Sequence, residues 1–212
     1  MSAKSDFYRR QAETIIKHME KRNIRGMYAE NAAEARAKAL ALIQPDTTVA
    51  FGGSMTLEEI GLLDTLRERS DIRLLDRYAC HTQEEREQLF RESYFSDYYL
   101  MSSNAITLDG QLINIDGTGN RVSALIYGPK QVIIIAGMNK VVTSLEEGIA
   151  RIRNISSPPN CVRLERKTPC AVTGTCGDCY GEDCICNQIV RTRRSAVKNR
   201  IQVILTGEPL GY

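Results

Sequence analysis

TTVAFGGSMTLEE, at residues 47–59, is the stretch that decides the fold class of this chain. Residues 47–51 are β-branched or apolar, which predicts a buried strand. Gly52 and Gly53 follow as a turn, and the Thr-x-x-Glu pattern that starts at Thr56 predicts a capping box and a helix running to about Arg69. A strand that passes through a tight turn into a helix is the repeating unit of an α/β fold.

The same alternation continues on both sides of this stretch. Residues 131–136 include the run Val-Ile-Ile-Ile and predict a strand at the centre of the sheet. An Asp-Gly pair at 109–110 predicts a hairpin with a type I′ turn, so that the sheet would be mixed. The other expected elements are helices at about 6–21, 32–42, 82–95 and 144–155 and strands at 72–75, 98–101 and 201–205. We therefore predict a mainly parallel, mixed sheet that helices cover on both faces.

Composition narrows the class of protein further. A chain of 212 residues with 42% hydrophobic residues can bury one core, so we expect a single domain over 1–212. Its 28 basic and 26 acidic residues are mixed along the chain, which argues against a nucleic-acid partner. No apolar run approaches the ~20 residues of a membrane span, and the first residues lack the apolar core of a signal peptide. The expected location is the cytoplasm.

The glycine turn is a candidate ligand site because ligands of α/β sheets bind at the carboxyl ends of strands. There Gly52 and Gly53 would let a ligand approach the backbone, with Ser54 and Thr56 at the start of the following helix. An equally good interpretation is a tight turn in which the hydroxyl residue is a plain helix cap.

Two more polar segments follow predicted strands. The first, residues 116–121, contains a carboxylate, two glycines, an amide and a guanidinium, and the second brings Asn139 and Lys140. Either could be a surface turn with local backbone bonds, but two such strand ends suggest a shared cleft. Arg121 and Lys140 there would favour a small anionic ligand, a carboxylate or a phosphate. The candidate residues of the first segment are Asp116, Gly117, Gly119, Asn120 and Arg121.

Cysteines gather near the end of the chain. Five of the seven lie between Cys170 and Cys186, and Cys161 precedes them. Thiolates at such spacing suit zinc or an iron–sulfur cluster, although the spacing matches neither the usual zinc ribbon nor the ferredoxin run. The alternative is simple thiol packing. We expect a metal-binding loop at about 161–188.

Three motifs together carry a resemblance to a known family. They are Phe51–Gly61, Asn114–Arg121 and Gly137–Val142. In this order they resemble the lactate-utilisation (LUD) family, and the cysteine segment resembles that of one branch of it. The resemblance implies a three-layer α/β/α sandwich similar to the sugar-phosphate isomerase and CoA-transferase superfamily. It also implies a link to bacterial oxidation of L-lactate to pyruvate beside iron–sulfur partner proteins.

The same resemblance implies a metal-ligand set and a cofactor. Cys170, Cys176, Cys179 and Cys186 would bind an iron–sulfur cluster, of the 4Fe-4S type, or zinc. Cys184 stands where this branch usually has an arginine, which leaves the fourth ligand open between Cys184 and Cys186.

Three functions follow as hypotheses. The first is a redox-associated protein of hydroxy-acid metabolism, with Asp116, Arg121 and Lys140 as the catalytic residues. The second is an isomerase or transferase acting on a phosphorylated or CoA-linked molecule, whose base would be Asp116 ahead of Asp109 or Glu58. The third is a non-catalytic assembly subunit with structural zinc. A homo-oligomer is compatible with these hypotheses, and the sequence leaves the oligomeric state open.

Overall fold

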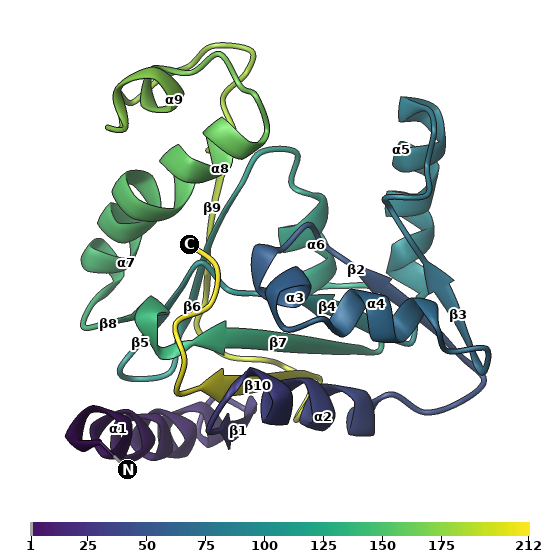
Figure 1. Cartoon of the computed structure of the whole chain (residues 1–212), viewed down its shortest axis with the longest axis vertical. Helices are drawn as coiled ribbons and strands as arrows, with labels where there is room; N and C mark the ends of the chain where they lie inside the picture. Colours follow the sequence, from purple (N-terminus) through teal and green to yellow (C-terminus); the bar gives the residue numbers. More distant parts are fainter. Residues whose placement is uncertain (1) are drawn as a thin grey trace.

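A six-stranded, fully parallel sheet forms the centre of the molecule (Figure 1). The computed structural model describes residues 2–212. In spatial order the strands are β1 (Arg25–Ala29), β10 (Ile201–Thr206), β7 (Gln131–Gly137), β4 (Tyr98–Met101), β2 (Thr47–Phe51) and β3 (Ile72–Leu75). The aliphatic strand β7 has neighbours on both sides, as its sequence predicts.

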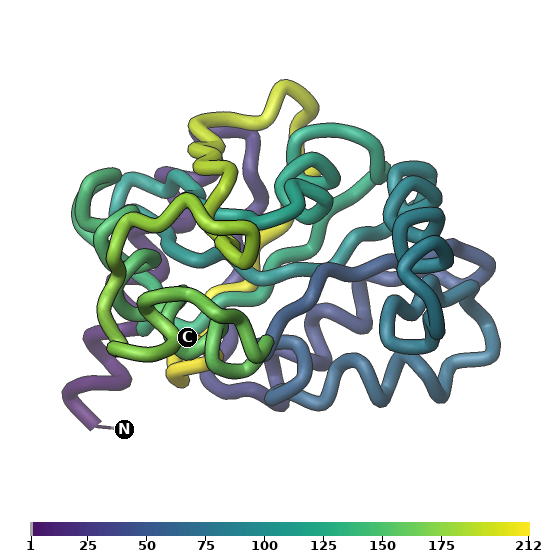
Figure 2. The backbone as a smooth tube through the Cα atoms, turned by 90° about the horizontal axis from the view of Figure 1, so that it is seen from above, coloured from purple at the N-terminus to yellow at the C-terminus, as the bar shows by residue number. Residues whose placement is uncertain are grey.

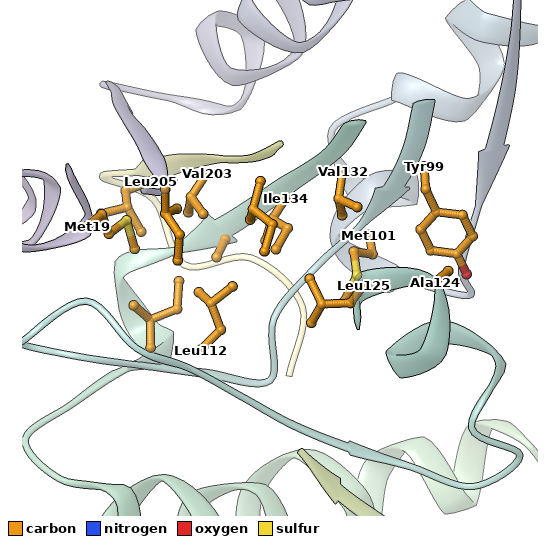
Figure 3. Close-up of a cluster of buried hydrophobic side chains, with 14 of the residues drawn as sticks. Met19, Tyr99, Met101, Leu112, Ala124, Leu125, Val132, Ile134, Val203 and Leu205 are labelled. Atoms are coloured by element: carbon orange, nitrogen blue, oxygen red, sulfur yellow. The ribbon is translucent and has the colours of Figure 1, made fainter. Parts of the chain in front are cut away.

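Helices cover both faces of this sheet, so the α/β/α fold class is confirmed. One face packs against α1 (Ala3–Glu20), α5 (Gln83–Glu92) and α6 (Asn120–Ile126), and the other against α2 (Ala32–Leu42), α3 (Met55–Glu59) and α4 (Leu62–Arg67). Alternate residues of β7 point to opposite layers. Ile134 lies in the cluster that contains Met19 of α1 (Figure 3), whereas Ile133 lies in the opposite cluster.

The predicted hairpin lies in a second sheet instead of the main one. This sheet has the order β8 (Val141–Val142), β5 (Ala105–Thr107), β6 (Leu112–Asp116) and β9 (Gln188–Thr192). The mixed pairing is confined to it, because β5 and β8 are parallel while β6 is antiparallel to β5 and β9. The turn is not type I′: of its residues only Gly110 has a positive φ, 83°, where type I′ requires two.

A helical arm packs on the second sheet. It consists of α7 (Leu145–Arg151), a π-helical turn (Ile152–Ser156), α8 (Ser157–Arg163) and the short α9 (Pro169–Thr173). The helix predicted at about 144–155 does not end there, because helical conformation continues through the π-helical turn into α8. Pro158 and Pro159 occupy the first turn of α8, a position that tolerates a residue without an N–H. Within residues 2–212, every helix is too short or too polar to cross a bilayer.

Candidate functional site

A cleft of about 290 Å³ lies where the loops after β2, β4 and β6 meet the helical arm. It gathers most residues of the predicted site: Gly53, Ser54, Thr56, Asp116, Gly117, Asn120, Arg121 and Lys140. Gly52, Gly119 and Asn139, which the sequence also predicts, are not among the residues that line it. The sheet edges therefore bring together three segments that are far apart in the sequence, as polar strand ends predict.

The loop after β2 is built differently from its prediction. Ser54 is the helix cap, and its Oγ accepts from the backbone N–H of Leu57 at 3.4 Å. The helix that follows is interrupted at Gly61, whose φ is 65°. Thr56 is therefore not a cap, and its buried hydroxyl accepts a hydrogen bond from Lys140 instead.

Lys140 is the most unusual side chain of the cleft. It follows β7 in a 3₁₀ turn, is only 4% exposed, and its Nζ donates to Thr56 Oγ1 at 2.9 Å and to Ser102 Oγ at 3.0 Å. No carboxylate of residues 2–212 forms an ion pair with it. Burial, and secondarily the guanidinium of Arg151, lower the pKa of Lys140 from 10.5 to about 7. Two hydroxyl acceptors match the two N–H groups of a neutral amine and leave its lone pair unused.

Residues 207–212 close one side of the Lys140 site. Leu210 N–H donates to Asn139 Oδ1 at 3.2 Å and Gly211 N–H to Glu59 Oε2 at 2.6 Å. Figures 1 and 2 both place this end of the chain beside the helical arm, and its last carbonyl accepts from Arg151. Asn139, predicted to bind ligand, therefore holds this segment in place.

Gly211→Ala should expose Lys140 to water. The φ of Gly211 is 58°, and a Cβ there would lie 2.7 Å from Thr56 Oγ1 and 3.2 Å from Lys140 Nζ. The segment would have to move away, so we expect the pKa of Lys140 to rise by roughly 1 unit or more. A ¹³C NMR titration of the lysine ε-carbons measures this. Gly181→Ala, which adds a Cβ with nothing within 4 Å, is the control; an unchanged pKa in the Gly211 variant would contradict the arrangement.

Arg121 is saturated by protein acceptors. It bonds to Asn114 Oδ1 at 2.6 Å and to Asn104 Oδ1 at 2.9 Å, it reaches the carbonyls of Ser102 and Ile115, and it pairs with Asp116 at 3.2 Å. Its side chain is 12% exposed. Gly52 leaves room for this side chain, because a Cβ at residue 52 would lie 3.1 Å from the Arg121 side chain. Arg121 thus ties the loops after β4 and β6 together.

Asp116 and the cysteine segment are joined directly. Asp116 Oδ1 accepts from the N–H of Gly119, whose φ of 91° turns the chain into α6. The Asp116 carbonyl accepts from Asn187 N–H at 3.0 Å, and Ile185 lines the cleft. A Cβ on Gly117 would lie 3.2 Å from Ile185 Cα. The loop that carries the cysteines is therefore a wall of the cleft.

The thiols of this segment are close to one another in pairs. Cys161 on α8 lies close to Cys170, and Cys179 lies close to Cys184. Burial raises the pKa of the Cys161 thiol to about 11, and burial also raises the pKa of Cys186, which donates to Ser157 Oγ at 3.3 Å. Cys161 belongs with the cluster, although its isolation in the sequence suggests an ordinary core residue. Within residues 2–212, no three or more His, Cys, Asp or Glu side chains already have an arrangement that would hold a metal ion.

Comparison with known proteins settles the family. A family model described as the LUD domain matches residues 12–206. The chain belongs to the LUD family. A DUF162 family protein from Deinococcus radiodurans is similar over 98% of this LUD chain and 99% of its own, with 16% identity and a TM-score of 0.51.

Partial structural similarities to the LUD chain are weaker. Ribose 5-phosphate isomerase A from Neisseria gonorrhoeae aligns over 52% of each chain with 15% identity and a TM-score of 0.34. The ribose 5-phosphate isomerase from Methanocaldococcus jannaschii aligns over 55% of this chain and 56% of its own, with 15% identity and a TM-score of 0.36. No curated protein matches the sequence.

Several side chains of the LUD cleft are absent from the sequence prediction. Ser102 and Asn104 directly follow β4, so the polar run Ser-Ser-Asn after a buried strand is a signal that could have found them. Arg77, Arg86 and Arg163 also line the cleft, and single arginines outside glycine motifs give no such signal.

The other predicted bases lie outside the cleft lining. Asp109 sits in the β5–β6 turn and pairs with Arg22 at 2.5 Å. Glu58 accepts from the hydroxyl of Tyr78 at 2.8 Å. Asp116 does line the cleft, but its two oxygens already accept from Gly119 and Arg121. Lys140 is the lining residue whose geometry best suits a base.

Proposed function

We propose that this LUD protein is an enzyme that transfers a proton on a small organic anion bearing a carbonyl or hydroxyl group, with Lys140 as the base. The observation that carries this proposal is the buried amine of Lys140 with its pKa of about 7 at the cleft. A general base is most effective when its pKa lies near the working pH. An ordinary surface lysine, with a pKa near ~10.4, would be protonated and have no lone pair to offer.

The charge of the cleft supports an anionic substrate. Its lining contains one carboxylate side chain, Asp116, which Arg121 neutralises. The cationic residues of the lining are Arg77, Arg86, Arg121, Arg163 and Arg166, beside the neutral amine of Lys140. Cations that share a partly desolvated cleft attract and orient an anion.

The reaction balances without a further reactant. The lone pair of Lys140 Nζ takes a proton from the carbon next to a carbonyl. The two electrons of that C–H bond form the C=C bond of an enolate, and the carbonyl π electrons move to its oxygen. Return of the proton to the same carbon restores the amine and gives exchange. Where that carbon carries a hydroxyl group, the hydroxyl proton moves to the enolate oxygen, and return of the carbon-bound proton to the former carbonyl carbon gives isomerisation.

Hydrogen exchange into D₂O tests this function. The probes are pyruvate, L-lactate and dihydroxyacetone phosphate, followed by proton NMR at several pD values. We expect protein-dependent loss of the C–H signal from at least one of them, faster above neutral pD than below. No exchange from any of the three at any pD would contradict the proposal.

A second function, redox metabolism of lactate or a related hydroxy acid, rests on a separate observation, the paired thiols of the cysteine segment. Oxidation of lactate to pyruvate releases two protons and two electrons. Lys140 would accept the hydroxyl proton, the proton from the oxidised carbon would go to water, and two oxidised iron–sulfur centres of the partner proteins would each take one electron. Thiolates are ligands that soft metals prefer, and four free thiols are available beside the cleft. Cys170 lies on α9, and Cys176, Cys179 and Cys186 lie on the irregular segment that follows it. An iron–sulfur cluster held there would supply electron transfer, whereas zinc would fix the loop in an assembly subunit.

The metal content of the purified protein distinguishes the iron–sulfur cluster from structural zinc. We expect protein purified without oxygen to contain iron and sulfide and to show visible charge-transfer bands. Cys176→Ser should lose them, while Cys80→Ser, far along the sequence, should keep them. Stoichiometric zinc would support the structural version and overturn the redox one. Protein without metal would overturn both.

A further inference from the structure

Three arginines of the cleft pair with no carboxylate among residues 2–212. Many surface arginines here pair with a carboxylate, as Arg69 does with Asp71 at 2.7 Å. Within residues 2–212, Arg77, Arg86 and Arg163 form no ion pair, and all three line the cleft. Three guanidinium charges without a carboxylate partner therefore lie at the same cleft.

Arg77 is held in position by an aromatic ring and not by a carboxylate. It follows β3, is half-buried, and its guanidinium lies 5.0 Å from the centre of the Phe90 ring. This cation–π contact orients the group but satisfies none of its N–H donors. A Cβ on Gly53 would lie 3.2 Å from Arg77 Nη1, so the bare glycine keeps that edge of the guanidinium open.

Arg86 and Arg163 come from two separate helices. Arg86 is on α5 and Arg163 on α8, and Figure 1 shows these helices on either side of α3 and α6. Both side chains are exposed. Arg163 bonds only to the neutral Asn160 Oδ1, at 2.8 Å and 3.2 Å, which leaves its charge unbalanced. The three arginines thus approach the cleft from three elements.

The geometry points to a phosphate subsite formed by Arg77, Arg86 and Arg163, which makes the substrate of Lys140 a phosphate ester. One planar guanidinium is enough to bind a carboxylate through two parallel hydrogen bonds. Three guanidiniums around one cleft match the three oxygens and the double charge of a phosphate group. Lys140 is 4% exposed whereas Arg86 and Arg163 are exposed, so the phosphate would lie at the mouth and the reacting carbon inside.

This inference rests on the proposed function and names the substrate class of the same cleft. Isothermal titration calorimetry with inorganic phosphate, and with acetate as the carboxylate probe, tests it at low ionic strength. We expect phosphate to bind at least roughly tenfold more tightly than acetate, which corresponds to about 1.4 kcal/mol. Each of Arg77→Gln, Arg86→Gln and Arg163→Gln should weaken phosphate binding by roughly tenfold.

The control variant is Arg194→Gln, which removes the same charge from an exposed arginine outside the cleft lining. It should leave phosphate binding unchanged. Equal affinity for phosphate and acetate, or unchanged binding in all three cleft variants, would overturn the subsite. Lys140→Met should keep phosphate binding, so the two proposals fail separately. Bound phosphate without proton exchange would refute only the chemistry, and exchange from pyruvate without phosphate binding would refute only the subsite.

Discussion

Lys140→Met is expected to slow proton exchange by ~10²–10⁴-fold, the usual contribution of a positioned general base. Methionine preserves the length and apolar stem of the side chain but removes the amine. Folding should not suffer, because burial already disfavours the charged form of Lys140. The matched control is Lys130→Met, which removes an exposed lysine paired with Asp97. The NMR exchange assay, with urea unfolding in parallel, checks both expectations.

The pKa of Lys140 determines how the exchange rate should change with pH. Below pH 7 the amine of Lys140 is protonated and cannot accept a proton, so the rate should fall as the pH falls through about 7. Above that pH the rate should reach a plateau. Lys140→Arg, which stays protonated, should be inactive across this whole range. A Lys140→Met variant with full activity would refute the assignment of the base.

Arg121→Met should destabilise the fold by about 3–5 kcal/mol, because it leaves the buried carboxylate of Asp116 without its cation. It also removes the bonds to Asn104 and Asn114 that join the loops after β4 and β6. Urea unfolding measures the change in free energy. The exposed helical pair of Arg10 with Asp6 provides the control, since Arg10→Met should cost less than about 0.5 kcal/mol. A cost for Arg121→Met no larger than that of the control would mean that the network carries no stability.

Local patterns predict the elements that depend on local forces. The strand at 47–51 and the helix at 32–42 have the predicted bounds because their apolar residues and caps lie within the segments themselves. Strand β9 escapes prediction because it has little apolar periodicity and exists through its pairing with β6. Membership of the hairpin in a second sheet is likewise set by its long-range partners, β8 and β9.

The candidate site likewise has features that the sequence indicates and features that only the fold reveals. The loops at 52–56 and 116–121 line the same cleft, although β2 and β6 belong to different sheets. The residues alone do not reveal that Arg121 is internally satisfied or that Lys140 is buried under Gly211, since these contacts join distant parts of the sequence. Arg77 and Arg86 give no local signal, and only the fold makes them neighbours of the cleft.

The pKa of Lys140 in the folded protein tests the central claim most directly. A ¹³C NMR titration of the lysine ε-carbons would identify its resonance by the signal lost in Lys140→Met. We predict a midpoint near pH 7, well below that of the other lysines. A midpoint near the ordinary lysine value of ~10.4 would contradict a neutral, buried base in this cleft.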